Sequence, residues 1–224
     1  MIRFENVTKR YPTKTGMKSI LENASFEIAR GRSLGVLGVN GAGKSTFLRL
    51  ISGSELPNRG RVRRDGVTVS WPLGFMETFH GSLSGRDNVK FACRVYGRRI
   101  DEVTDYVRDF AEIGAHFDEP VKTYSSGMRA RLAFGLSMAF NFDVYLVDEI
   151  TAVGDARFKA KCADVFSEKL ERSDIVMVSH SMGTLRTYCS VGCVLREGGV
   201  EFFDTIDEAI DLYERLTKSV GTVS

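Results

Sequence analysis

The sequence has few of the residues that build disulfide frameworks or metal sites. Its 224 residues include four cysteines and three histidines, and Cys93, Cys162, Cys189 and Cys193 show no CxxC spacing. Zinc sites and small disulfide-bonded domains both need close, regular spacings of such residues. We therefore expect neither, and a reducing cytoplasmic setting fits this pattern best.

Long apolar runs are also missing. Residues 1–6, Met-Ile-Arg-Phe-Glu-Asn, lack the uninterrupted apolar segment of a signal peptide. No later stretch approaches the roughly 20 apolar residues that a membrane-spanning helix needs. If the protein works at a membrane, we expect a partner to supply the crossing.

An excess of charge of one sign is absent too. The chain carries 31 basic and 29 acidic residues, for a net charge of +2, which gives no global field for non-specific nucleic-acid binding. The best local candidate for a basic patch is the arginine-rich run 59–64, which we interpret as a solvated edge that discourages sheet pairing. We expect no nucleic-acid partner.

The order of apolar patterns predicts an α/β fold. Residues 2–11 and 20–28 are predicted strands of an antiparallel edge. Residues 33–37 form a strand that enters a glycine-rich loop, and the apolar runs 144–147 and 175–178 are typical of buried parallel strands. The remaining elements predicted by periodicity are a helical insertion over residues 85–141, a hairpin over 191–203 and a helix over 207–216.

The most specific motif lies at residues 38–45, Gly-Val-Asn-Gly-Ala-Gly-Lys-Ser, which matches GxxxxGK[ST]. Its glycines let backbone N–H groups converge on phosphate oxygens, and the helix that follows adds a positive dipole end. In P-loop enzymes the lysine reaches the β- and γ-phosphates and the serine hydroxyl coordinates Mg²⁺. We therefore expect ATP and Mg²⁺ here, with candidate contacts at Gly38, Asn40, Gly41, Ala42, Gly43, Lys44, Ser45 and Thr46.

An acidic pair follows the second buried strand. Asp148 and Glu149 come directly after residues 144–147, at the end of the strand where open α/β sheets place their ligands. Asp148 fits a group that helps to hold Mg²⁺, together with Ser45, and Glu149 fits a group that polarises the attacking water. The alternative is that one of them only caps the next element.

Two further polar segments are candidate contacts for phosphate, one inside the helical insertion and one after the last buried strand. Residues 125–127, Ser-Ser-Gly, lead into a helix and could offer N–H groups and a hydroxyl to a phosphate, although a serine there is often only a cap. His180 follows the strand 175–178, at the same sheet end as Asp148 if the sheet is parallel. A single histidine of this kind is often structural, but its place after that strand favours a γ-phosphate or catalytic contact.

Taken in order, residues 38–45, 125–128, 148–149, Asp155 and His180 resemble the Walker A, signature, Walker B, D-loop and switch-histidine motifs of ABC-type ATPases. This resemblance implies a single nucleotide-binding domain over residues 1–224. A RecA-like P-loop core with an antiparallel β part would comprise 1–84 and 142–224, and a helical signature subdomain would comprise 85–141.

In that family two domains pair head to tail, so each ATP lies between the Walker A loop of one copy and the signature of the other. The resemblance implies that Ser126 and Gly127 serve the ATP of a second copy and that Asp155 works at the dimer junction. Tyr11 matches the aromatic residue that stacks on adenine, and its alternative is a strand-end tyrosine in the core.

Three stretches resemble the branch that exports capsular and related cell-surface polysaccharides: residues 124–132, 148–155 and 85–88. Such members work with a separate integral membrane subunit, at the cytoplasmic face of the inner membrane. One departure is the missing Q-loop glutamine between Trp71 and Asn88, where Glu77 and His80 are the nearest polar candidates.

Other functions remain open at this stage. The chain could be an ABC subunit for another substrate, or a soluble ABC-type ATPase that acts on nucleic acid or ribosomes. The near-neutral charge and the lack of sustained heptads speak against the latter. A small-molecule kinase would leave residues 125–128 and His180 unexplained.

Overall fold

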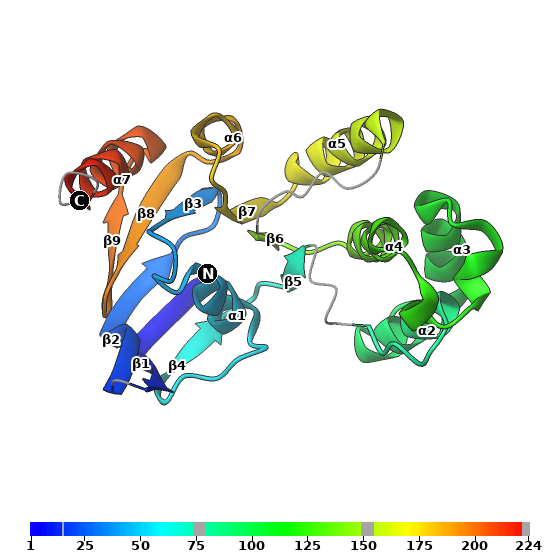
Figure 1. Ribbon diagram of the computed structural model, residues 1–224, viewed down its shortest axis with the longest axis horizontal. Helices are drawn as coiled ribbons and strands as arrows, with labels where there is room; N and C mark the ends of the chain where they lie inside the picture. The colour runs from blue at the N-terminus through cyan, green and yellow to red at the C-terminus, as the bar shows by residue number, and fades with distance from the viewer. Residues whose placement is uncertain (15, 74–78, 149–154, 221–224) are drawn as a thin grey trace. The chain divides into compact units, whose positions relative to one another are not determined.

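The computed structural model describes residues 1–14, 16–73, 79–148 and 155–220. The chain divides into two compact units, whose elements are labelled in Figure 1. The α/β unit contains residues 1–14, 16–72, 142–148 and 173–220, and the helical unit contains residues 73, 79–141 and 155–172.

This division differs from the expected one at helix α5 (Ala156–Leu170), which was assigned to the α/β core but groups with the helical unit. Its Phe158 makes an edge contact with Phe110, with ring centroids 5.5 Å apart, and the Arg131 guanidinium lies 4.1 Å from the centre of the Phe158 ring. These contacts to residues from the insertion hold α5 in the helical unit, and sequence periodicity does not reveal them.

The first sheet of the α/β unit is antiparallel, with the order β2-β1-β4. It consists of β1 (Ile2–Thr13), β2 (Gly16–Ile28) and β4 (Arg59–Arg64). Strands β1 and β2 extend beyond their predicted bounds because they pair as far as Thr13 and Gly16. The arginine-rich run forms the edge strand β4 itself and pairs with β1, so the expectation of an edge is confirmed while the run's own pairing was not foreseen.

The second sheet has six strands in the order β5-β6-β7-β3-β8-β9. Strands β6, β7, β3 and β8 run parallel, and β9 pairs antiparallel with β8. Their bounds are β3 (Leu34–Leu37), β5 (Val69–Leu73), β6 (Val144–Asp148), β7 (Asp174–Val178), β8 (Val191–Arg196) and β9 (Gly199–Phe203). The predicted buried parallel strands are confirmed, and β3 lies between β7 and β8.

Three helices belong to the same unit: α1 (Lys44–Ser52), α6 (Met182–Tyr188) and α7 (Ile206–Val220). Helix α7 packs directly on the backbone of the sheet. A β carbon on Gly35 of β3 would lie 2.5 Å from Ile206 Cδ1, and one on Gly192 of β8 would lie 2.4 Å from Ala209 Cβ. The requirement for glycine is strictest at Gly192, because the Cβ of Ala209 cannot rotate away, whereas the tip of the Ile206 side chain could move to make room at Gly35.

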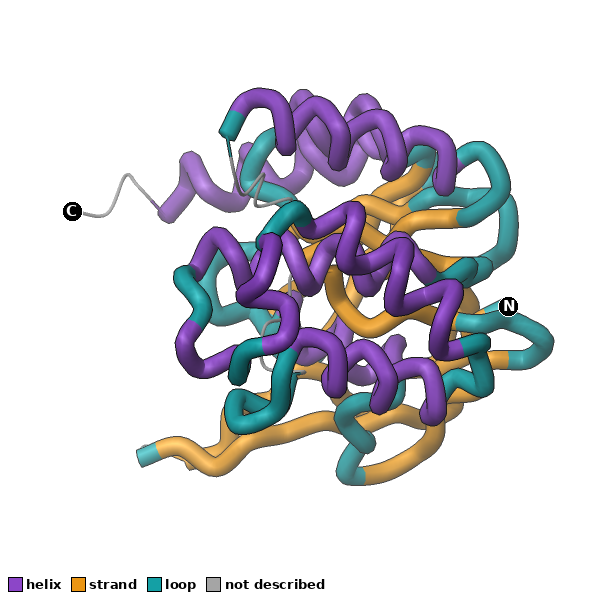
Figure 2. Tube along the Cα trace, turned by 90° about the vertical axis from the view of Figure 1, so that its right-hand side faces the viewer, coloured by secondary structure: helices purple, strands orange, loops and turns teal. Residues whose placement is uncertain are grey.

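The helical unit contains α2 (Gly85–Val95), α3 (Ile100–Ala111), α4 (Ser126–Ala139) and α5, with short 3₁₀ turns at Gly114–Asp118 and Val121–Thr123. The predicted face of α3 is buried, with Val103, Val107 and Phe110 all at most 9% exposed. Figure 2 shows the helices in purple and the connecting loops in teal. Within the described ranges, no helix combines the length and the apolar character that crossing a bilayer requires.

Candidate functional site

The loop between β3 and α1 has a backbone that favours glycine at three positions. Gly38, Gly41 and Gly43 have φ angles of 156°, 79° and 101°, in a region that L side chains rarely adopt. A β carbon on Gly43 would also lie 2.5 Å from Ile20 Cγ2. Because Gly43 occupies the N-cap position of α1 and no side chain caps this helix, the first N–H groups of α1 are left for an anion.

Lys44 lies across this loop. Its Nζ donates to the carbonyl oxygens of Gly38 at 2.7 Å and Val39 at 3.3 Å. The Ala42 N–H also donates to the Val39 carbonyl, at 3.0 Å. These bonds fold the loop into a compact turn with a positive charge over it, which suits the binding of phosphate groups.

A pocket of about 460 Å³ opens over the loop, and all its lining residues belong to the α/β unit. Nine predicted site residues line it: Tyr11, Asn40, Gly41, Gly43, Lys44, Ser45, Thr46, Asp148 and His180. Gly38 and Ala42 belong to the loop but not to the lining. The other lining residues are Lys18, Ile20 and Val178.

The parallel strands bring Asp148 and His180 to this pocket. Strands β6 and β7 are in parallel register with Asp148 opposite Val178, so Asp148, which ends β6, and His180, which follows β7, lie at one end of the sheet. This is the placement expected from the sequence, and His180 is exposed while Asp148 is half-buried.

The same pocket contains oxygen ligands of the kind that Mg²⁺ prefers, the Ser45 hydroxyl and the Asp148 carboxylate. Among the residues that the structure describes, no cluster of three or more His, Cys, Asp or Glu side chains could hold a metal. The donor set therefore fits Mg²⁺ in the presence of phosphate oxygens and water, which usually complete its coordination.

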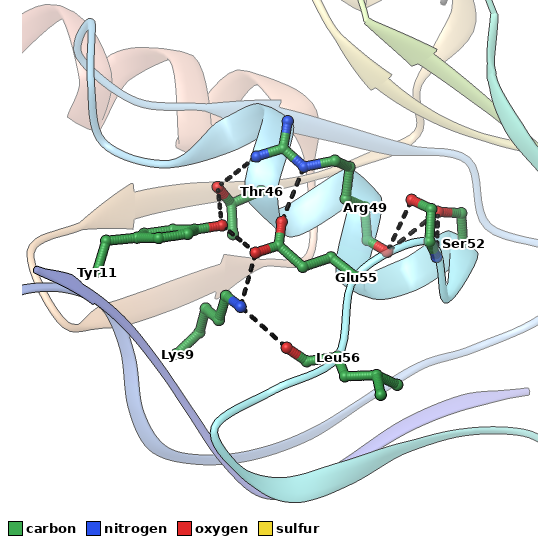
Figure 3. A network of polar contacts seen from close by, with 8 residues as sticks. Lys9, Tyr11, Thr46, Arg49, Ser52, Glu55 and Leu56 are labelled. Carbon is green, nitrogen blue, oxygen red and sulfur yellow. Dashed lines mark hydrogen bonds and ion pairs between the residues drawn. The ribbon is translucent and has the colours of Figure 1, made fainter. Parts of the chain in front are cut away.

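Tyr11, which lines the pocket, packs partly against the core and is also held by polar contacts (Figure 3). Its hydroxyl donates to Glu55 and lies 3.3 Å from Thr46 Oγ1. Arg49 donates to Glu55 at 2.8 Å and to Thr46 at 3.1 Å. We call these four side chains the Glu55 ring.

Lys9 adds a second cation to Glu55. Its Nζ lies 2.6 Å from the Glu55 carboxylate, donates to the Leu56 carbonyl at 2.9 Å and sits 4.9 Å from the centre of the Tyr11 ring. Burial alone would raise the pKa of Glu55, but hydrogen bonds from Lys9, Tyr11 and Arg49 outweigh it and lower the pKa to about 2. Glu55 is therefore ionised at neutral pH.

Sequence reasoning missed Lys18, which lies opposite Tyr11 in the β1–β2 register. Its ammonium would be 3.2 Å from a β carbon on Gly41, and it lines the pocket. The phosphate-loop motif ends at residue 45 and does not reveal a lysine contributed by another strand. Only the hairpin register, which pairs Lys18 with Tyr11, could have indicated it.

Ser126, Gly127 and Asp155 belong to the helical unit. Ser126 is exposed at the first turn of α4, which Ser125 caps by accepting from the Met128 N–H at 3.2 Å. A β carbon on Gly127 would meet only Ser125 Oγ, at 3.9 Å. The packing of this chain therefore does not demand a glycine at this position.

Asp155 has a local role within the helical unit. It is the N-cap of α5, where its side chain accepts from the Phe158 N–H at 2.9 Å, and it forms an ion pair with Arg131 at 3.1 Å. The hydrogen bond from the Phe158 N–H is the main reason that the pKa of Asp155 lies below its usual range.

Two other predicted groups, Glu149 and Glu77, lie outside the described residues. His80, the other candidate for the missing glutamine, is exposed, and its backbone N–H donates to Asn88 Oδ1 at 2.8 Å. This bond anchors the start of the helical insertion and leaves the imidazole in solvent.

Comparison with known proteins identifies close relatives. The chain is 50% identical over 218 residues to the polysialic acid transport ATP-binding protein KpsT of Escherichia coli, covering 96% of this chain and 99% of that protein. It is 47% identical over 216 residues to the capsule polysaccharide export ATP-binding protein CtrD of Neisseria meningitidis serogroup B, covering 96% of this chain and all of that protein.

The fold has solved counterparts at lower identity. A dimeric ATP-binding cassette in a post-hydrolysis state, bound to ADP and Pi, matches with a TM-score of 0.72 at 20% identity, over 90% of this chain and 98% of that one. This likeness confirms the expected P-loop α/β fold. The family model described as "ABC transporter" matches residues 21–152. The chain therefore belongs to the ABC transporter family, as one of its ATP-binding domains.

Proposed function

We propose that this chain is the ATP-binding and ATP-hydrolysing subunit of an exporter for capsular or related cell-surface polysaccharide. The observation that carries the ATPase part is that the phosphate loop, Asp148 and His180 line the same pocket. The relatives that support the transport part are named for transport of polysialic acid and export of capsule polysaccharide.

Each group of the proposed site has a distinct task. Lys44 and the N–H groups at the start of α1 hold the phosphates, and Ser45 and Asp148 hold Mg²⁺, which neutralises charge on the phosphate oxygens. Glu149 orients and polarises the attacking water, and His180 contacts the γ-phosphate. Gly38, Asn40, Gly41, Ala42, Gly43 and Thr46 shape the loop around the phosphates, and Tyr11 stacks on adenine.

Residues 1–224 then act as a single nucleotide-binding domain that is complete only as a head-to-tail dimer. Ser126 and Gly127 contact the ATP held by the second copy, and Asp155 lies at the junction. The exposure of Ser126 and the open space around Gly127 support this proposal, because a group that closes on another molecule's phosphate needs both. ATP drives the cycle by binding the closed dimer more tightly than the open one.

The membrane-crossing part belongs to a separate integral membrane subunit, and this chain works against it at the cytoplasmic face of the inner membrane. Affinity purification of the tagged chain from detergent-solubilised cells tests this. We expect an integral membrane protein to be recovered with it. Recovery with ribosomes or DNA in its place would support the soluble ATPase alternative and reject the transport proposal.

Replacing Lys18 by methionine should weaken ATP binding about fivefold, because an exposed charge near phosphate is worth about 1 kcal/mol. The loss should be smaller for ADP and absent for adenosine, and added salt should reduce it. Titration calorimetry with the three ligands measures this. Lys14→Met, on the same hairpin and exposed, is the control and should bind all three ligands like the parent. An equal loss of affinity for ATP, ADP and adenosine in Lys18→Met would contradict a contact between Lys18 and the phosphates.

A further inference from the structure

Glu55 lies outside the phosphate-loop motif, and no role was expected for it. It follows helix α1 in the loop that leads to β4, and its side chain is 20% exposed. It accepts from three donors, Lys9, Tyr11 and Arg49, which come from strand β1 and helix α1. Glu55 thereby joins the strand that carries Tyr11 to the helix that follows the phosphate loop.

The hydrogens of the Glu55 ring have one consistent arrangement. The tyrosine hydroxyl has a single hydrogen, which Glu55 accepts, so Thr46 must be the donor in the contact between Thr46 and Tyr11. The Thr46 oxygen in turn accepts from Arg49, which also donates to Glu55. The ring is closed, and such connected hydrogen bonds reinforce one another.

This ring fixes the plane of the Tyr11 side chain. Thr46 is 6% exposed and Lys9 is 7% exposed, so two of the groups that hold Tyr11 are themselves immobilised by packing. The Lys9 ammonium lies over the aromatic ring, and the same tyrosine lines the pocket, where a flat ligand can stack on it. Tyr11 is thus oriented before any nucleotide arrives, and preorganisation of this kind increases affinity.

We propose that Glu55 is a positioning residue for the nucleotide base. Through the Tyr11 hydroxyl it holds the aromatic ring that lines the pocket, so that affinity for the base depends on Glu55 while affinity for the phosphates alone does not. This inference rests on the proposed stacking of Tyr11 on adenine.

The test compares binding of ATP with binding of inorganic tripolyphosphate, which has the phosphates but no base. Titration calorimetry on the full chain gives both dissociation constants, and their ratio is the base selectivity. In Glu55→Ala we expect ATP affinity to fall about three- to tenfold, with tripolyphosphate affinity unchanged. Tyr11→Phe breaks the same contact from the other side while keeping the ring, and should lower the selectivity in the same direction.

Glu5→Ala is the matched control. Glu5 is on the same strand as Tyr11, is 24% exposed and is also held by two cations, but these are Arg61 and Arg63 of β4, whereas Glu55 accepts from Tyr11 itself. Its base selectivity should equal that of the parent. Unchanged tripolyphosphate binding also shows that each variant is folded at the phosphate loop.

Two results would overturn the proposal. One is a proportional loss of affinity for ATP and for tripolyphosphate in Glu55→Ala, which would mean that Glu55 supports the phosphate loop as a whole. The other is parental selectivity in both Glu55→Ala and Tyr11→Phe. Tyr11→Ala distinguishes failure of this inference from failure of the proposed function. If Tyr11→Ala also keeps parental selectivity, the stacking role of Tyr11 is wrong. If Tyr11→Ala is the only variant that loses selectivity, the role of Glu55 alone is wrong.

Discussion

Replacement of Lys44 by methionine should reduce ATP hydrolysis by about 10²–10³-fold, the effect of removing one well-placed charge-stabilising donor from an active site. The physical reason is that Lys44 is the ammonium that lies across the phosphate loop, where charge accumulates on the transferred phosphoryl group. ATP affinity should fall as well, because the same ammonium attracts the phosphates in the ground state. Phosphate release measured at saturating ATP separates the two effects.

Lys44 also stabilises the phosphate loop, so the controls must separate loss of catalysis from loss of folding. Its Nζ bonds the Gly38 and Val39 carbonyls, so the substitution removes two contacts from the turn, and the melting temperature should be measured alongside activity. Lys14→Met removes an exposed lysine from the same unit and should keep parental hydrolysis. A Lys44→Met protein that melts like the parent and hydrolyses ATP at the parental rate would show that catalysis takes place elsewhere.

Replacement of Glu149 by glutamine should also bring hydrolysis to a small fraction of the parental rate, but with the opposite effect on binding. Glutamine keeps the shape of the side chain and cannot accept a proton, so ATP stays bound and unreacted. Because ATP favours the closed dimer in our proposal, the variant should elute as a dimer in gel filtration with ATP and as a monomer with ADP. The expectation for Glu149 follows from its place next to Asp148, which ends β6 at the pocket.

A second substitution makes this result specific. Ser126→Arg places a long charged side chain at an exposed position of the first turn of α4. Added to Glu149→Gln, it should prevent the ATP-dependent dimer while leaving ATP bound to the monomer. If Glu149→Gln stays monomeric with ATP, either the composite site or the catalytic role of Glu149 is wrong. If the double variant still dimerises, the signature residues do not lie at the interface.

The parts of the fold that sequence patterns predict well are those with a strong local signal. The apolar runs before Asp148 and His180 indicate buried strands because parallel strands are covered on both faces, and the structure has them as β6 and β7. The phosphate loop is equally clear, since its glycines meet a backbone requirement that the φ angles of Gly41 and Gly43 display.

What could not be predicted depends on contacts between distant residues. Strand β5 was missed because it is short and contains Pro72, which is unusual inside a strand. Lys18 and Glu55 reach the site only through strand pairing and through a loop that folds back to β1. No spacing along the chain relates either of them to the phosphate loop.

The position of β3 has a consequence for how the protein is made. The strand that leads into the phosphate loop is synthesised early, at Leu34–Leu37, but both its neighbours come late, at Asp174–Val178 and Val191–Arg196. A nascent chain therefore carries β3 without either of the strands that pair with it until most of the protein has left the ribosome. Pairing across such separations is slow and exposes apolar strands in the meantime. Because Asp148, Val178 and His180 complete the pocket only once β6 and β7 have been made, we expect nucleotide to stabilise the completed unit rather than the early steps of folding.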